Sequence, residues 1–220
     1  VNGANVDKDR DWLRGHLGGQ ATLDDHSDDK ALVALQGPRA PEVLAGITSL
    51  GLPALPYYHF DRGTVAGVEA LVSRTGYTGE DGFEIMADCA DAPAVWHALM
   101  AAGGPLGIAP AGLGARDSLR LEACMPLYGH ELDDDTSALE AGLGFFVKLD
   151  KPEMLGMERL RREKAEGVAR RLVGIEMLDR GIPRQGHPIL ADGAPIGVVT
   201  SGTHSPTLDK PIGLGYVPPA

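Results

Sequence analysis

The sequence predicts an α+β fold, in which mixed or antiparallel sheets with helices are followed by a small all-β unit. Two observations carry this prediction. Up to about residue 167, short apolar or alternating stretches that suit strands are interleaved with longer stretches of helical spacing. Beyond residue 170 the chain has short strand-like stretches separated by turns rich in Gly and Pro.

The first half of the chain predicts four strands after a polar surface segment of helix and loop at 7–30. Strand 31–36 is a short apolar run, and the next two show alternating polarity. A short helix is expected behind Pro38 and Pro41, because proline suits the first turn of a helix. The expected strands cover residues 31–36, 57–63, 68–74 and 82–86.

Three longer helices are expected at 91–104, 110–126 and 152–167. In the first, Asp91 can cap the N-terminus and Gly103–Gly104 can end it. Its apolar stripe is expected to consist of Val95, Trp96, Leu99 and Met100. The last helix is strongly charged, and the residue composition of the chain changes after it. We therefore expect a first region at 1–150, a helical linker at 151–169 and a β unit at 170–220, with strands at 171–177, 195–202 and 211–217.

Composition excludes several function classes. The 220 residues are 43% hydrophobic and 23% charged, which is ordinary globular composition. No apolar run reaches the roughly eighteen residues of a membrane span, so no membrane partner is expected. The net charge of −11 argues against nucleic acid, because phosphate binding requires an excess of Lys and Arg.

Two cysteines, Cys89 and Cys124, are too few for a disulfide framework and lack the spacing of metal ligands. Both are expected to be small core residues in a protein of a reducing compartment. The acidic segment GHELDDDTS at 129–137 lacks the glycine and spacing of a calcium loop. It is interpreted as a solvated acidic turn, and no metal site is expected.

Segment 73–86, SRTGYTGEDGFEIM, places three carboxylates among three glycines. Within a strand, Phe83 and Ile85 share one face and Glu84 points to the other. A carboxylate with apolar neighbours needs donors, and a paired N–H edge satisfies both of its oxygens. Glu84 is therefore a candidate ligand-binding residue, with a hairpin in solvent as the alternative. Glu80 and Asp81 have turn chemistry and are expected to lie in water.

Two further positions are candidates on pattern alone. Arg116 lies four residues before Arg120, so the two cations share a helix face and need a carboxylate or an anionic ligand. Asp117 and Glu122 are expected to point elsewhere, and a surface salt bridge is the alternative role for Arg116. Tyr57 and Tyr58 could stack on a planar ligand, although a core tyrosine is the commoner outcome.

Four stretches, taken together and in order, resemble the aminomethyltransferase (T-protein) family of the glycine cleavage system. They are ALVALQGPRAPEVL, SRTGYTGEDGFEI, GLGARDSLRLEACMPLYGHELDDDTSALEAGLGF and GVVTSGTHSPTLDKPIGLGYV. The resemblance covers most of the chain. It implies folate-binding domains followed by part of a small C-terminal β-barrel, and transfer of a one-carbon unit from the aminomethyl-lipoyl H-protein to tetrahydrofolate with release of ammonia.

The resemblance also implies residue roles. Glu84 matches the Glu that grips the amino and ring N–H edge of the pterin, and Arg116 matches a further folate-site residue. Tyr57 and Tyr58 correspond to the aromatic pair that lines the same pocket. The catalytic aspartate of the family is expected upstream of Val1, and the last strands of the barrel beyond residue 220. We therefore expect this fragment alone to be inactive.

The sequence departs from the family at Phe145, where many members have Trp, which affects local packing. Two alternatives stay open. One is the folate domain of a dimethylglycine or sarcosine dehydrogenase, which an upstream flavin domain would identify. The other is a non-transferase folate-binding module of the iron–sulfur-assembly type, whose Cys- and Gln-containing signature is absent from GYTGEDGFE. The expected location is the cytoplasm of a bacterium, with a mitochondrion as the alternative.

Overall fold

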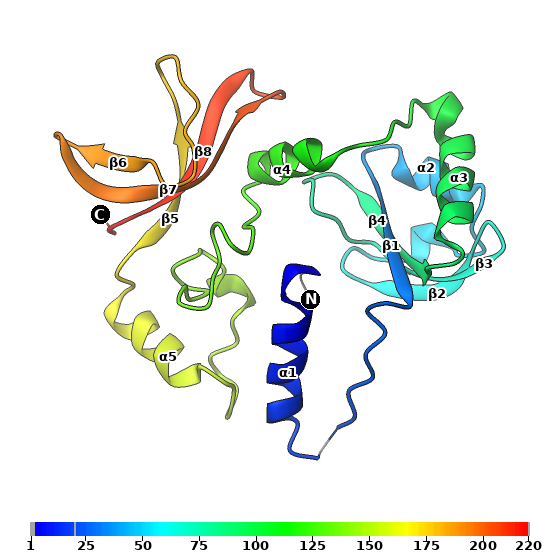
Figure 1. The fold of residues 1–220 in the computed structure, drawn as a ribbon, viewed down its shortest axis with the longest axis horizontal. Coiled ribbons are helices and arrows are strands. Elements are labelled where there is room, and N and C mark those ends of the chain that lie inside the picture. Colours follow the sequence, from blue (N-terminus) through cyan, green and yellow to red (C-terminus); the bar gives the residue numbers. More distant parts are fainter. Residues whose placement is uncertain (1–2, 20, 220) are drawn as a thin grey trace. The chain divides into compact units, whose positions relative to one another are not determined.

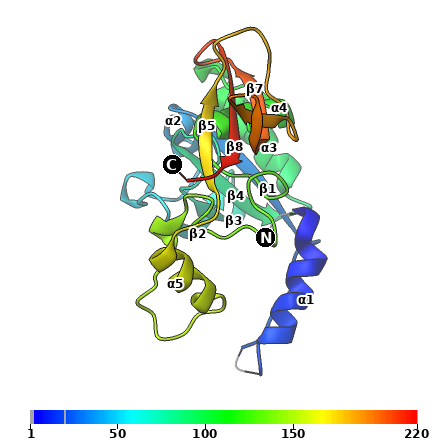
Figure 2. The same ribbon diagram turned by 90° about the vertical axis from the view of Figure 1, so that its left-hand side faces the viewer.

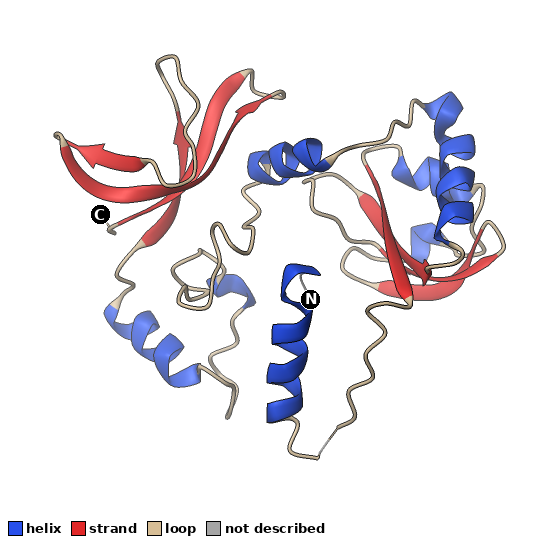
Figure 3. Cartoon of the chain, viewed as in Figure 1, coloured by secondary structure: helices blue, strands red, loops and turns tan. Residues whose placement is uncertain are grey.

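The computed structural model describes residues 3–19 and 21–219, and the chain divides into two units, 1–110 and 111–220. Helices and antiparallel sheets are present in both (Figures 1 and 3). This confirms the expected α+β class. The domain boundaries that the sequence predicts near residues 150 and 170 stay a prediction.

The first unit is built on a four-stranded sheet of order β1-β4-β3-β2, in which all neighbours are antiparallel. Its strands are β1 Lys30–Gln36, β2 Phe60–Val65, β3 Val68–Ser73 and β4 Gly82–Asp88. In the register of the sheet, Glu84 of β4 lies between Ala34 of β1 and Ser73 of β3. Paired residues share a face of an antiparallel sheet, so these three side chains are neighbours.

Two helices, α2 Ala40–Ala45 and α3 Ala92–Gly103, cover one face of this sheet. Helix α1 Val6–His16 has no buried residue. Leu44 of α2 and Val95 of α3 join Phe83 and Ile85 of β4 in one core, and all four are completely buried. The predicted alternation along β4 is thereby confirmed. Trp96, expected in the apolar stripe of α3, is instead 41% exposed.

The second unit contains two helices and a second antiparallel sheet. The elements are α4 Leu113–Glu122, α5 Met157–Glu166, β5 Arg171–Glu176, β6 Pro188–Ala191, β7 Ala194–Ser205 and β8 Lys210–Val217. The strand order is β5-β8-β7-β6, and β5, β8 and β7 are seen side by side in Figure 2. A register shift between Val199 and Ser201 bends the long strand β7.

Local differences from the predictions have physical reasons. The strand expected at 57 begins at Phe60, because Tyr58 has a φ of +63° and lies in a turn. The cysteines are exposed rather than core residues. Cys89 lies just after β4, and Cys124 follows the end of α4 with a φ of +55°.

No helix among the described residues is long and apolar enough to cross a membrane. The same residues contain no group of three or more His, Cys, Asp or Glu side chains arranged to hold a metal ion.

Candidate functional site

Glu84 lies in the middle of β4 on the sheet face opposite the helices. Its side chain is half-buried, and its Oε2 accepts a hydrogen bond of 2.5 Å from the hydroxyl of Thr75. Among the described residues, Thr75 is the one hydrogen-bond partner of this carboxylate, and no arginine or lysine of them forms an ion pair with it. The carboxylate therefore keeps acceptor capacity for a ligand.

Large apolar side chains on the same sheet face as Glu84 are exposed. Leu32 of β1 pairs with Met86 of β4, and these side chains are 55% and 39% exposed. Phe60, which pairs with Ser73 beside Glu84, is 64% exposed. Exposed carbon near a carboxylate fits a flat ring with one hydrogen-bonding edge, because the ring face can lie on carbon while its donors meet oxygen.

The loop between β3 and β4 is held by two sets of contacts. At its base, Arg74 Nη2 lies 2.7 Å from Asp81 Oδ2 and Nε lies 3.0 Å from Oδ1. These bonds from Arg74 hold the pKa of Asp81 below its ordinary value. Asp81 is thus ion-paired and partly buried, and the expectation that it lies in water is wrong. Glu80, as expected, is exposed.

The second contact comes from Gln36 at the end of β1. Its Nε2 donates to the carbonyl oxygens of Thr75 and Phe83 at 3.1 and 3.2 Å. Gly76 and Gly82 surround this amide closely, since a Cβ at either position would lie 1.9 or 2.6 Å from Gln36 Oε1. These glycines are needed for close approach rather than for turn conformation alone. Sequence reasoning missed Gln36, because no local sequence pattern indicates the contacts that its side chain makes.

Tyr57 and Tyr58 form a T-shaped pair with ring centroids 4.4 Å apart, and both are exposed. Neither is a core tyrosine. Partial burial raises the pKa of Tyr57, and its hydrogen bond with Tyr58 raises it further. The N–H of Tyr58 donates to the carbonyl oxygen of Arg74, the residue before Thr75. The tyrosine turn and the loop that contacts Glu84 therefore lie at the same end of the strands.

Arg116 lies on α4 in the second unit and is exposed. Arg120, expected to share its face, is completely buried. Arg120 donates to Asp117 Oδ1 through Nε and Nη2, at 2.8 and 2.7 Å, so the expectation that Asp117 points elsewhere is wrong. A carboxylate of the protein thus stabilises Arg120, while Arg116 stays a candidate for contact with a ligand.

The acidic segment 129–137 is a solvated turn only in part. Asp133, Asp134 and Asp135 are exposed, but Glu131 is completely buried. Glu131 Oε2 lies 2.7 Å from Arg120 Nη1. The sequence-based interpretation failed here because Glu131 looks like its acidic neighbours, and its cation lies eleven residues earlier.

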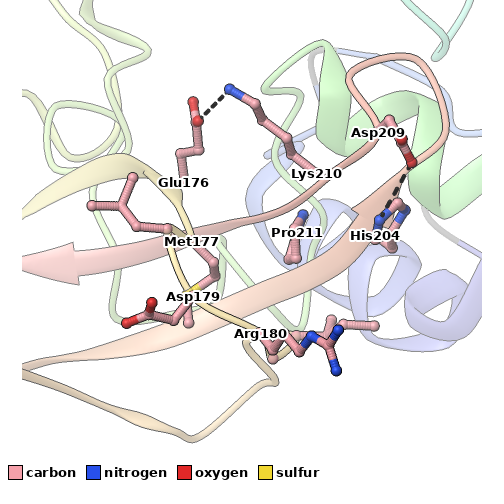
Figure 4. A pocket seen from close by; sticks show the side chains of 11 residues that line it. Glu176, Met177, Asp179, Arg180, His204, Asp209, Lys210 and Pro211 are labelled. Atoms are coloured by element: carbon pink, nitrogen blue, oxygen red, sulfur yellow. Dashed lines mark hydrogen bonds and ion pairs between the residues drawn. The ribbon is translucent and has the colours of Figure 1, made fainter.

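An open surface pocket of about 560 Å³ lies between the end of β5 and the start of β8 (Figure 4). Lys210 is ion-paired with Glu176 at 2.6 Å within this pocket, and His204 Nε2 lies 3.7 Å from Asp209 Oδ1. None of the sequence-predicted candidates lines it. The geometry favours the open face around Glu84 over this pocket as the ligand site.

Comparison with known proteins gives matches along nearly the whole chain. Residues 1–151 match the GCVT N-terminal domain, and residues 170–220 match the glycine cleavage T-protein C-terminal barrel domain. An aminomethyltransferase of Geobacillus kaustophilus (strain HTA426) is 56% identical over 219 residues, which cover 99% of this chain and 60% of the relative. One from Desulfitobacterium hafniense (strain Y51) is 51% identical over 220 residues, covering 100% of this chain and 60% of the relative.

A solved structure is also similar. The crystal structure of glycine cleavage system aminomethyltransferase T from Bartonella henselae matches with a TM-score of 0.87 and 33% sequence identity. The match covers 99% of this chain and 59% of that chain. The chain therefore spans about 60% of the length of the relatives that it matches.

Proposed function

Because the chain belongs to the glycine cleavage T-protein family, we propose that the whole protein is a tetrahydrofolate-dependent aminomethyltransferase. The single observation that supports this most directly is Glu84, a carboxylate that among the described residues is bonded only by Thr75 and that has exposed apolar side chains on its sheet face. The relatives that share 51–56% identity with the chain are named aminomethyltransferases. No observation favours a dehydrogenase folate domain or a non-transferase folate module.

The proposed reaction needs no oxidant. The one-carbon unit arrives as an aminomethyl group on a sulfur of the lipoyl arm of the H-protein. Its bonds to nitrogen and to sulfur break, so that ammonia and a thiol leave. Tetrahydrofolate supplies the two nitrogens that take up the carbon as a methylene. The two protons that those nitrogens release balance the ammonia and the thiol.

The described residues fit the role of holding tetrahydrofolate. An ionised carboxylate at Glu84 accepts two parallel N–H donors of a pterin edge. Met86 and Leu32 present carbon beside it, on which the ring can lie. The contribution of these residues to catalysis is proximity, because a fixed ring presents its nitrogens to the incoming carbon in one geometry.

Other candidates have supporting roles in this proposal. Arg116 is exposed and always charged, which suits contact with an anionic part of the folate. Tyr57 and Tyr58 offer exposed ring faces at the edge of the same sheet as Glu84. No described residue of this chain is assigned the proton handling at the folate nitrogens.

The proposed partner is the lipoylated H-protein, which carries the aminomethyl group. The proposed compartment is the bacterial cytoplasm, because the relatives named above are bacterial. No role with nucleic acid is proposed, because the net charge is −11.

The test is a single-turnover assay of the whole protein with aminomethylated H-protein. We expect ammonia and methylenetetrahydrofolate to form in equal amounts, and only when tetrahydrofolate is present. Titration calorimetry with tetrahydrofolate alone should show one site. Ammonia release that is independent of folate, together with no heat of folate binding, would contradict the proposal.

A further inference from the structure

The hydroxyl of Thr75 fixes one oxygen of the Glu84 carboxylate. The distance of 2.5 Å between Thr75 Oγ1 and Glu84 Oε2 is typical of a hydroxyl that donates to an ionised carboxylate. Thr75 lies in the loop after β3, whereas Glu84 lies in the middle of β4. The bond therefore ties the strand that carries the carboxylate to the loop above it.

The position of this hydroxyl is itself determined by the surrounding contacts. The carbonyl oxygen of Thr75 accepts the hydrogen bond from Gln36 Nε2. The preceding residue, Arg74, is ion-paired with Asp81 and donates through Nη1 to the carbonyl oxygen of Leu55 at 3.0 Å. The backbone of Thr75 is thus held on both sides, so its hydroxyl lies at a fixed place beside Glu84.

Among the described residues, Glu84 Oε1 has no hydrogen-bond partner, and Oε2 has only Thr75. A glutamate with both oxygens free would rotate about its side-chain bonds and lose that freedom when a ligand binds. Fixing one oxygen before binding removes part of this loss, which is the usual gain from preorganisation.

We propose that Thr75 is a positioning residue, whose hydroxyl holds Glu84 in the rotamer that accepts the N–H edge of a flat heterocycle. This inference rests on the proposed function, since it takes Glu84 as the residue that binds the pterin. Thr75 does not need to touch the ligand, because its effect is transmitted through Glu84. It also favours rings with two parallel N–H donors, because the fixed carboxylate presents Oε1 together with the remaining lone pair of Oε2.

The experiment compares T75V and T75S in the whole protein by calorimetry with tetrahydrofolate. T75V keeps the shape and removes the hydroxyl, and we expect roughly tenfold weaker binding, the scale of one lost hydrogen bond to a charged group. T75S keeps the hydroxyl and should bind within about twofold of the wild type on the same reasoning. The matched control is T207V, because the hydroxyl of Thr207 also donates to a carboxylate, but to that of Glu122 rather than that of Glu84.

Kinetics and a double substitution separate positioning from a purely structural role. T75V should raise KM for tetrahydrofolate while kcat and KM for the aminomethylated H-protein stay unchanged. In an E84A background, T75V should cause no further loss of folate affinity. T75A serves the same test if T75V does not fold, because it removes the hydroxyl without adding a methyl group in its place.

Two outcomes would overturn the inference while leaving the proposed function standing. One is wild-type folate affinity in both T75V and T75A. The other is a loss of tetrahydrofolate affinity from T75V that is as large in the E84A background as in the wild type, which would mean that Thr75 acts without Glu84. If the wild-type protein does not bind tetrahydrofolate at all, the proposed function fails, and the positioning role fails with it.

Discussion

Arg120 Nη1 lies 2.7 Å from Glu131 Oε2, and both side chains are completely excluded from solvent. The remaining guanidinium N–H groups of Arg120 are also used. They donate to Asp117 Oδ1, Ser201 Oγ and the carbonyl oxygen of Met125. This pair connects α4 to the acidic turn and to β7, so the helix that carries Arg116 is anchored to the sheet of its own unit.

Removing the charge of Glu131 should strongly destabilise the protein. E131Q leaves the buried Arg120 guanidinium with the half-exposed Asp117 as its remaining counter-charge, and breaking one side of a buried pair costs about 3–5 kcal/mol. Urea unfolding followed by circular dichroism measures this change. The matched control is K210A, because Lys210 and Glu176 form an exposed pair whose loss should cost less than about 1 kcal/mol. Equal losses in the two variants would contradict the role given to the buried pair.

The contribution of Glu131 to stability should depend on pH. Burial raises the pKa of Glu131, but the hydroxyls of Ser201 and Thr200, the N–H of Leu127 and the charge of Arg120 together hold it below the ordinary glutamate value. Because the folded-state pKa of Glu131 is lower than its unfolded-state pKa, the ionised side chain stabilises the protein at pH values above the unfolded-state pKa. This stabilisation is lost as pH falls through the folded-state pKa.

The free-energy difference between wild type and E131Q should therefore be constant from pH 7 down to about 5 and should shrink at lower pH. Urea titrations of both proteins across this range provide the measurement. A difference that stays the same down to pH 3 would mean that Glu131 does not titrate as described.

Much of the fold could be predicted from the sequence, because local patterns determine it. Alternation placed Phe83 and Ile85 on the buried face of β4, and both are completely buried. Pro93 and Gly104 bound α3 as expected. Strand β2 begins three residues late, because the left-handed backbone of Tyr58 cannot be read from its side chain.

The contacts of the candidate site were less predictable, because they join residues distant in sequence. The side chain of Glu84 faces away from the core, as alternation predicts. Its neighbour Gln36 comes from a strand almost fifty residues earlier, and its role depends on the pairing of β1 with β4. The burial of Glu131 likewise depends on strand β7, whose position no local pattern reveals.

Adding one methyl group at Gly76 should displace Gln36. A Cβ there would lie 1.9 Å from Gln36 Oε1, so the amide must move and lose its bond to the carbonyl oxygen of Thr75. We expect G76A to lower the free energy of unfolding by about 1–3 kcal/mol, as for other strained or unsatisfied sites. The control is G46A, since a Cβ at Gly46 meets nothing within 4 Å. Equal stability of both variants by urea unfolding would contradict the close approach.

Removal of the Glu84 carboxylate should weaken folate binding specifically. We expect E84A to cost about 1–3 kcal/mol of tetrahydrofolate affinity, on the scale of a lost hydrogen bond to a charged group. Calorimetry on the whole protein gives the value, and E80A is the matched control, because Glu80 is an exposed acid in the neighbouring loop. An unchanged dissociation constant in E84A would remove Glu84 from the site.

Arg116 and Arg120 lie one turn apart on α4, so substituting each of them separates the proposed ligand-binding cation from a structural one. R116A should lower turnover with the aminomethylated H-protein and leave the melting temperature within a few degrees, because the side chain is exposed. R120A should lower the melting temperature strongly, because it leaves Glu131 buried without its cationic partner. Initial-rate assays and thermal unfolding of both variants make the comparison. If R116A melts as early as R120A, Arg116 belongs to the structural network, and its assignment to ligand binding is wrong.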